Sequence, residues 1–179
     1  MLEDDLILLR PFEEEDLKKW TSWFNDRNVT NQMNKGVFPN TLAQQRNRLN
    51  ALKADKHNIQ FAIVLKDKPP ALVGSIGIHG IDWVHRTATI SVLIGEEEGR
   101  GKGIGKKSIG CVVNHAFNKM NLRKITAGMW SVNVACEEAF IANGFVLEGV
   151  RKEQYHTDDG YIDALEYGLL KRDWLSNNH

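Results

Sequence analysis

The stretch Gly99-Arg-Gly-Lys-Gly-Ile-Gly-Lys-Lys at 99–107 decides how the rest of this chain is interpreted. It follows a β-branched stretch at 87–95 and leads into an amphipathic stretch at 103–120. Glycine has no Cβ atom, so consecutive backbone N–H groups can turn inward together and cradle an anion. The start of a helix adds unpaired N–H groups and a partial positive charge. The stretch therefore predicts a strand, a phosphate-binding loop and a helix, with charges from Arg100, Lys102, Lys106 and Lys107.

Two common phosphate-binding patterns do not fit this loop. The P-loop pattern G-x-x-x-x-G-K-[ST] fails because Lys107 occupies its last position and Arg100 its first. The dinucleotide pattern G-x-G-x-x-G fails because Lys106 occupies its sixth position. The pattern [QR]-x-x-G-x-[GA] does fit, through Arg100, Gly103 and Gly105. The alternative is a glycine-rich turn with solvated lysines, although so many glycines weaken a chain without cause.

Composition places the chain among globular proteins. Its 179 residues are 42% hydrophobic and 26% charged, and the 23 basic residues balance the 23 acidic ones. Nucleic acid or an anionic membrane would therefore need a local basic patch, and we expect neither as a partner. The N-terminus is acidic, and no apolar run approaches the roughly 18 residues of a membrane span. We expect one domain over residues 1–179 and a cytoplasmic location.

The order of elements indicates a mixed α/β sheet, neither doubly wound nor a sandwich. Strands are predicted at residues 6–10, ended by Pro11, and at 59–65, 72–81, 87–95, 124–129, about 146–155 and 161–170. Helices are predicted at 13–26, from an N-cap at Thr41 toward Lys56, at 103–120 and at 134–143, with Gly144 as a left-handed cap. An Asp-Asp-Gly turn at 158–160 joins the last two strands as a hairpin.

Three features together resemble the GNAT superfamily of N-acetyltransferases. They are the strand–loop–helix around the glycine loop, Asn133 after the next strand, and Asn-Gly-Phe at 143–145. The resemblance covers nearly the whole chain, from Leu-Leu-Arg-Pro-Phe at 8–12 to the run at 167–174. Its ends look like the branch of ribosomal-protein, spermidine and nucleotide-amino-sugar acetyltransferases. It implies a central, mostly antiparallel twisted sheet, split at the cofactor site and flanked by about four helices.

The same resemblance implies that acetyl-CoA is the cosubstrate and that the loop binds its pyrophosphate. The strand end at Leu93, Ile94 and Gly95 would carry a bulge whose backbone pairs with the pantetheine amides. One bulge N–H would stabilise the developing oxyanion by about 3 kcal/mol. Asn133 matches a pantetheine contact, and its alternative role as a helix N-cap is compatible with it. The expected cofactor-binding residues are Leu93, Ile94, Gly95, Arg100, Gly101, Lys102, Gly103, Ile104, Gly105, Lys106, Asn133 and Phe140.

At the catalytic positions the chain departs from the family pattern. Many relatives carry a proton-donating Tyr seven residues after the matching Asn, but Phe140 stands there and cannot donate. Cys136 lies where some ribosomal-protein acetyltransferases carry a Ser, so it is a candidate acid, and Tyr155 is another. Their alternatives are a packed core thiol and a solvated strand residue. No base is assigned, and no set of side chains has the spacing of a metal site.

The predicted activity is acetyl transfer to a primary amine: an amino sugar, a peptide N-terminus or a small amine. The alternative is a CoA-binding regulatory module that has lost catalysis, with Phe140 as its marker. A homodimer is compatible with either. Substrate choice is expected from residues 25–52 and the final hairpin. The stretch 28–39 is not rich in acidic residues, which makes a polycation a poorer candidate than a neutral acceptor.

Overall fold

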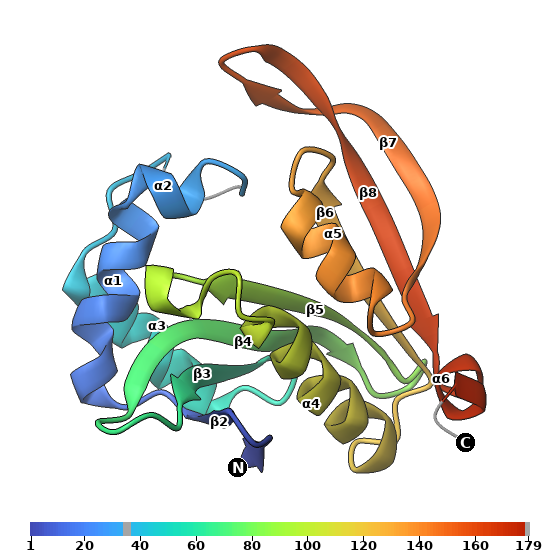
Figure 1. Cartoon of the computed structure of the whole chain (residues 1–179), viewed down its shortest axis with the longest axis horizontal. Coiled ribbons are helices and arrows are strands. Elements are labelled where there is room, and N and C mark those ends of the chain that lie inside the picture. The colour runs from blue at the N-terminus through green and yellow to red at the C-terminus, as the bar shows by residue number, and fades with distance from the viewer. Residues whose placement is uncertain (34–36, 178–179) are drawn as a thin grey trace.

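The structure, a computed structural model, describes residues 1–33 and 37–177. Within these ranges eight strands form one sheet in the order β1-β2-β3-β4-β5-β6-β8-β7, and only β5 and β6 pair in parallel (Figure 1). The mixed α/β, mostly antiparallel fold is therefore confirmed. The strands are β1 (Leu2–Glu3), β2 (Ile7–Pro11), β3 (Ile59–Leu65), β4 (Ala71–Asp82), β5 (Thr87–Ile94), β6 (Lys124–Trp130), β7 (Val146–Thr157) and β8 (Gly160–Leu170).

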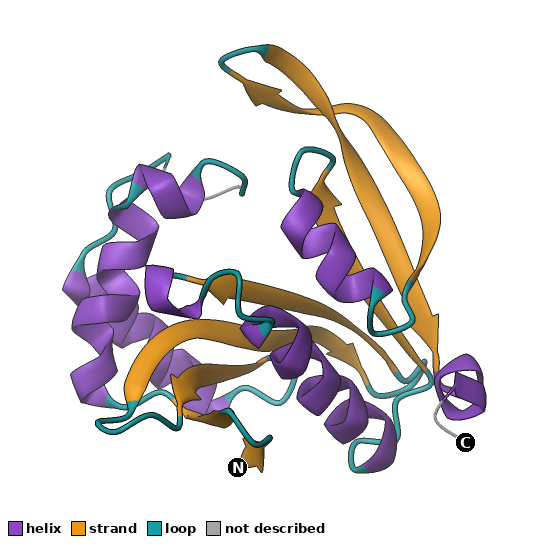
Figure 2. Cartoon of the chain, in the orientation of Figure 1, coloured by secondary structure: helices purple, strands orange, loops and turns teal. Residues whose placement is uncertain are grey.

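Helices cover both faces of the sheet (Figure 2). The described residues form six α-helices rather than about four: α1 (Leu17–Asn25), α2 (Arg27–Thr30), α3 (Leu42–Ala54), α4 (Ile104–Asn118), α5 (Val134–Ile141) and α6 (Lys171–Asn177). The two unexpected helices, α2 and α6, are too short to show a hydrophobic period. The predicted helix at 13–26 begins as a 3-10 turn, Glu14–Asp16, and continues as α1.

Alternating residues of β3 divide the core between the two faces of the sheet, as the pleat requires. Ile63 and Leu65 pack with the apolar side of α4, while Ala62 and Val64 pack with α1 and α3. Thr41 caps α3, because its hydroxyl accepts from the Gln44 N–H at 3.2 Å while the Gln44 side chain accepts from the Thr41 N–H at 2.8 Å. This reciprocal capping box fixes where α3 begins.

The sheet splits between β5 and β6, and this split creates the site. The two strands pair over three positions only, Thr87 to Thr89, and the hydroxyls of Thr89 and Thr126 lie 2.9 Å apart at the fork. On its other side β6 pairs with β8 along its whole length, from Lys124 to Trp130, and beyond the fork β8 is its one partner in the described sheet. The second half of β5 is therefore left with an open side in the described part of the chain.

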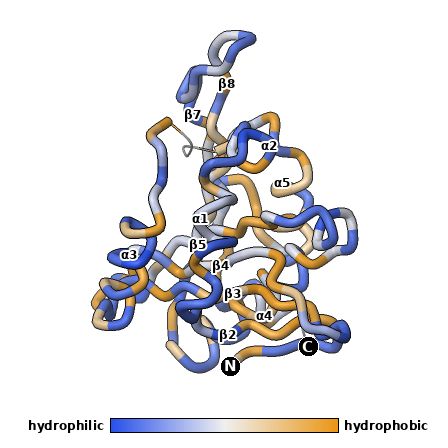
Figure 3. The backbone as a smooth tube through the Cα atoms, turned by 90° about the vertical axis from the view of Figure 1, so that its left-hand side faces the viewer, coloured by the Kyte–Doolittle hydropathy of each residue, from blue (hydrophilic) through white to orange (hydrophobic). Residues whose placement is uncertain are grey.

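The β7–β8 hairpin extends away from the rest of the molecule (Figure 3). Its tip is mostly hydrophilic, whereas β2, β3 and β4 are mostly hydrophobic. Among helices in the described ranges, none has the length and apolar character needed to cross a membrane.

Candidate functional site

The glycine loop adopts a backbone that requires glycine. Gly101 and Gly103 have φ angles of +69° and +72°, a region that other residues rarely adopt. A Cβ atom at either position would meet nothing within 4 Å, and one at Gly105 would meet only Ile94 Cγ1 at 4.0 Å. The loop therefore faces open space at the start of α4.

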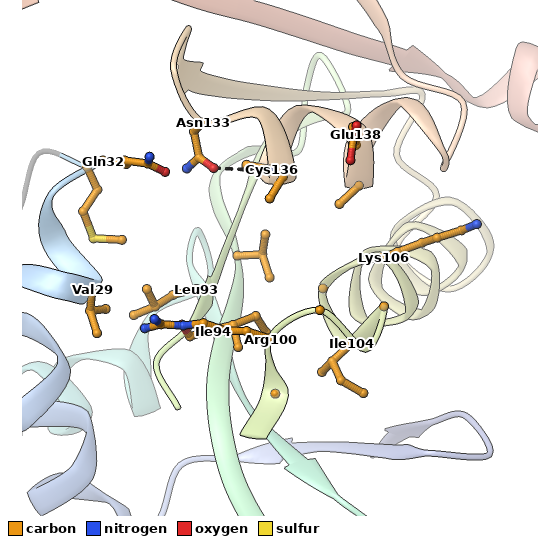
Figure 4. A pocket seen from close by; sticks show the side chains of 18 of the residues that line it. Val29, Gln32, Leu93, Ile94, Arg100, Ile104, Lys106, Asn133, Cys136 and Glu138 are labelled. Carbon is orange, nitrogen blue, oxygen red and sulfur yellow. Dashed lines mark hydrogen bonds between the residues drawn. The ribbon is translucent and has the colours of Figure 1, made fainter. Parts of the chain in front are cut away.

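The open space is a cavity of about 610 Å³, which is within the range of small-molecule sites. α2 and its C-terminal extension, the end of β5, the start of α4, and α5 surround it (Figure 4). Its lining includes nine of the predicted cofactor residues: Leu93, Ile94, Arg100, Gly101, Gly103, Ile104, Gly105, Lys106 and Asn133.

Three predicted cofactor residues lie outside this lining. Gly95 packs under Trp23, because a Cβ atom there would come within 2.3 Å of the indole ring. Lys102 is exposed on the loop. Phe140 is 2% exposed and packs edge-on against Phe145, with ring centroids 4.9 Å apart.

The start of α4 supplies the donors for an anion. The first helical N–H that is used locally belongs to Lys107, which donates to Gly103 O at 3.0 Å. The three preceding N–H groups are left for a ligand, as at any helix start. The Lys107 ammonium instead pairs with Asp4 and Asp5 at 2.8 and 2.7 Å, and these hydrogen bonds raise its pKa to about 12. Lys107 thus fastens the N-terminus to α4 rather than facing the cavity.

Arg100 lies along the end of β5. Its guanidinium group donates to the carbonyls of Ile94 at 3.4 Å and Gly95 at 3.3 Å, both near the upper limit for a hydrogen bond. Figure 4 shows this group beside Leu93, while the Lys106 ammonium points away along α4. Such weak contacts leave Arg100 free to turn toward a phosphate.

We expect Arg100→Ala to weaken CoA binding by about ten- to a hundredfold, because hydrogen bonds to charged groups contribute roughly 1.5–3 kcal/mol. A pantetheine fragment without phosphates should lose much less, and the CoA loss should shrink in high salt. Calorimetry with both ligands checks this, with Lys102→Ala as the control. Equal losses for both ligands would assign Arg100 to the edge of β5 instead.

The end of β5 has the geometry of a bulge. The N–H groups of Gly95 and Glu96 both donate to Val73 O, at 2.9 and 3.1 Å, so these two residues lie opposite a single residue of β4. Because N–H groups alternate sides along a strand, that of Ile94 faces the open side of β5. The free donor at this edge is therefore on Ile94, and the N–H of Gly95 is already used.

A second cavity of about 220 Å³ adjoins the first. The two share six lining residues: Gln32, Met33, Val92, Leu93, Asn133 and Cys136. The smaller cavity reaches through the split in the sheet, because α1 and α3 on one face and α5 on the other all contribute to it. Residues 34–36 of the stretch 28–39 lie outside the described residues.

Asn133 and Cys136 stand at the junction of the two cavities. The Asn133 Oδ1 atom accepts from the Cys136 N–H at 3.2 Å, which caps α5 (Figure 4). The N-cap role is thus present, and the amide nitrogen of Asn133 has no hydrogen-bond partner in the described part of the chain. Burial first, and then the Glu137 carboxylate, raise the pKa of the Cys136 thiol to about 11, so it stays protonated at neutral pH.

The structure brings the catalytic candidates into the smaller cavity. Tyr155 stacks on Trp130 with ring centroids 5.1 Å apart, and Phe140 and Cys136 line the same space. Arg48 lies within the region 25–52 predicted to choose the substrate, whereas sequence reasoning missed Trp20, Gln60, Ser75 and Trp130. Their sequence pattern indicates only helix and strand packing, so no local signal marks them.

Comparison with known proteins agrees with this geometry. The model of the acetyltransferase (GNAT) domain family matches residues 7–146. The uncharacterized N-acetyltransferase YoaA of Bacillus subtilis is 26% identical over 174 residues, covering 96% of this chain and 97% of that protein. The spermidine N(1)-acetyltransferase of Vibrio cholerae is 26% identical over 121 residues, covering 68% of this chain and 69% of that protein.

A solved structure shares the fold. The spermidine N-acetyltransferase of Vibrio cholerae, in complex with CoA and spermine, aligns with a TM-score of 0.85 at 23% identity, over 96% of this chain and 99% of that one. The family match alone covers more than three quarters of the chain. The chain therefore belongs to the GNAT acetyltransferase family and is an acetyl-CoA-dependent N-acetyltransferase.

Proposed function

We propose that acetyl-CoA binds in the larger cavity and that its acetyl group passes to a primary amine held in the smaller one. The observation that carries this proposal is the shared wall of six residues, because it lets a thioester and an amine meet. The pyrophosphate would bind the glycine loop and the start of α4. The pantetheine arm would follow the open side of β5 toward Asn133.

The reaction requires few groups from the protein. The amine nitrogen attacks the thioester carbonyl, the carbon–sulfur bond breaks, the nitrogen loses a proton and the CoA thiolate takes one. The N–H of Ile94 would stabilise the negative charge on the carbonyl oxygen, a type of contact that contributes about 3 kcal/mol. Cys136 and Tyr155 are the proposed proton donors, since both line the smaller cavity. We assign no base.

The activity can be tested with purified protein, acetyl-CoA and a panel of amino sugars, polyamines and peptides with free N-termini. Release of the CoA thiol that depends on an added amine is the expected result, and mass spectrometry identifies the acetylated product. Saturable acetyl-CoA binding without acetylation of any amine would instead favour a regulatory module that has lost catalysis.

Location and assembly are further proposals. Cys111 and Cys136 are both free thiols, which suits a reducing compartment, and we propose the cytoplasm. We also propose a homodimer, because β7 is an edge strand whose Val146, Leu147 and Val150 are exposed. Light scattering on the purified protein measures the assembly directly, and a monomer at working concentration would contradict the dimer.

A further inference from the structure

The smaller cavity has an unusual charge for a site that receives an amine. Its described lining contains one formal charge, the guanidinium group of Arg48, and no Asp, Glu or Lys. The other polar groups are neutral: Gln32, Gln60, Ser75, Ser91, Asn133, Cys136, Tyr155 and the Trp indoles. A protonated or partly protonated amine thus enters a cavity that offers it no carboxylate, and a cation is already present in the wall.

Arg48 lies at the mouth of this cavity. Its guanidinium carbon is 5.5 Å from the ring centroid of Trp20 and 5.9 Å from that of Phe24, so aromatic faces hold it on one side. Arg48 is exposed to solvent, and the protein packed around its guanidinium group still lowers its pKa through desolvation. A guanidinium group remains charged at neutral pH even so.

The charge of Arg48 is not neutralised by a carboxylate in the described ranges. Arg46, two residues earlier on α3, is paired with Glu14 at 2.5 Å, whereas Arg48 forms no ion pair with any described side chain. The helix therefore carries one arginine used in an ion pair and one directed to a cavity. A charged side chain that lines a cavity and has no ion-pair partner is stabilised when a ligand of opposite charge binds in that cavity.

Two other lining residues carry an unpaired donor. The indole N–H groups of Trp20 and Trp130 are buried and have no hydrogen-bond partner in the described part of the chain. Indole nitrogens donate and never accept. Both indole N–H groups are covered by protein, so Arg48 is the charged donor that the described lining offers to a ligand.

We infer that the acceptor is a primary amine that also carries an anionic group, and that Arg48 binds this group while the amine faces the thioester. The inference rests on the proposed function and narrows it to a substrate class. It separates this chain from an enzyme for polyamines, whose second ammonium would approach Arg48 without a carboxylate to receive it. Arg48 is a specificity residue here, because it takes no part in acetyl transfer.

Matched acceptors test the inference. β-Alanine and β-alaninamide differ in a carboxylate, O-phosphoethanolamine and ethanolamine differ in a phosphate, and 1,4-diaminobutane carries a second cation. We expect each anionic amine to have a kcat/KM about ten- to a hundredfold above its neutral partner, the range expected of a charge-assisted hydrogen bond. The anionic pair with the larger ratio tells whether carboxylate or phosphate is the natural group.

Arg48→Met should abolish this preference, mainly through a higher KM, because methionine keeps apolar cover on Trp20 and Phe24 but has no charge. Arg48→Lys should keep part of the preference. Arg46→Met is the matched control, since it removes a cation from the same helix outside the cavity, and it should leave the preference unchanged. Thermal unfolding of all three variants separates loss of recognition from loss of fold.

Two results would overturn the inference. One is a kcat/KM for the neutral amines or diaminobutane that equals the kcat/KM for the anionic amines. The other is a preference for anionic amines that survives in Arg48→Met. If no amine is acetylated, the proposed function fails separately. Calorimetric binding of β-alanine and β-alaninamide to the protein–CoA complex then decides the inference. Equal affinity for the two, or an affinity difference that Arg48→Met leaves in place, would refute it.

Discussion

Replacing Gly105 with valine is expected to weaken acetyl-CoA binding by about a hundredfold or more while the protein stays folded. Gly105 lines the larger cavity in the first turn of α4, and a Cβ atom there has only Ile94 Cγ1 near it, at 4.0 Å. The valine side chain would thus occupy the space of the phosphates and cover the helical N–H groups. Losing two charge-assisted hydrogen bonds costs roughly 3–6 kcal/mol, which sets the expected scale.

Stability should change little, because valine has a higher helix propensity than glycine. The same argument fails at Gly103, whose φ of +72° would strain a β-branched residue and confuse a binding loss with a folding loss. Gly149→Val is the matched control, since a Cβ atom there meets nothing within 4 Å and the residue lies in β7, outside both cavities. A folded Gly105→Val protein with unchanged affinity by calorimetry would exclude the loop as the phosphate site.

The fold could be predicted from the sequence where local chemistry fixes the backbone. The capping box at Thr41, the left-handed Gly144 with a φ of +86° and the glycine loop are each set by residues close in sequence. Short elements could not be predicted. The four residues of α2 are too few to show a hydrophobic period. The cap of this helix is one side-chain hydrogen bond, in which Asp26 accepts from the Asn28 N–H at 2.8 Å.

The two cavities also differ in how far their lining residues could be predicted from the sequence. The larger one is lined by three stretches, 28–33, 92–106 and 133–142, and the predicted cofactor residues in this lining come from the second stretch and from Asn133. The smaller one joins Trp20, Arg48, Ser75, Trp130 and Tyr155 from five separate elements. These contacts depend on where β6 leaves β5, which follows from the packing of the whole sheet. Sequence reasoning located the substrate region only broadly, at residues 25–52 and the final hairpin.

The other large effect is expected at Cys136. We expect Cys136→Ala to lower kcat by about ten- to a hundredfold with little change in the KM for acetyl-CoA, which is the low end of the range for losing a general acid. The thiol lines both cavities and is protonated at neutral pH because burial raises its pKa to about 11. Cys111→Ala is the control, since Cys111 is a free thiol outside both linings.

The raised pKa gives this prediction a pH signature. A group whose pKa is raised keeps its proton below that value, so a proton supplied by Cys136 remains available until the pH passes about 11. The kcat profile should therefore show no loss of an acid with a pKa near 8.5, the ordinary value of a thiol. Loss of kcat around pH 8.5 in the wild-type enzyme, absent from Cys136→Ala, would contradict the burial of this thiol.

The high pKa also limits what Cys136 can do, because donating a proton to an ordinary thiolate near 8.5 is uphill by about 3 kcal/mol. Tyr155 is the competing donor. If Tyr155→Phe lowers kcat and Cys136→Ala does not, the role of the acid belongs to Tyr155.

Phe140→Tyr in the Cys136→Ala background should restore part of the rate, since it returns a hydroxyl to the wall of the smaller cavity. Phe140 is 2% exposed, so a hydroxyl that finds no partner would lower the unfolding temperature without restoring rate. Measuring the unfolding temperature and kcat of the same double variant therefore separates a failed rescue from a damaged core.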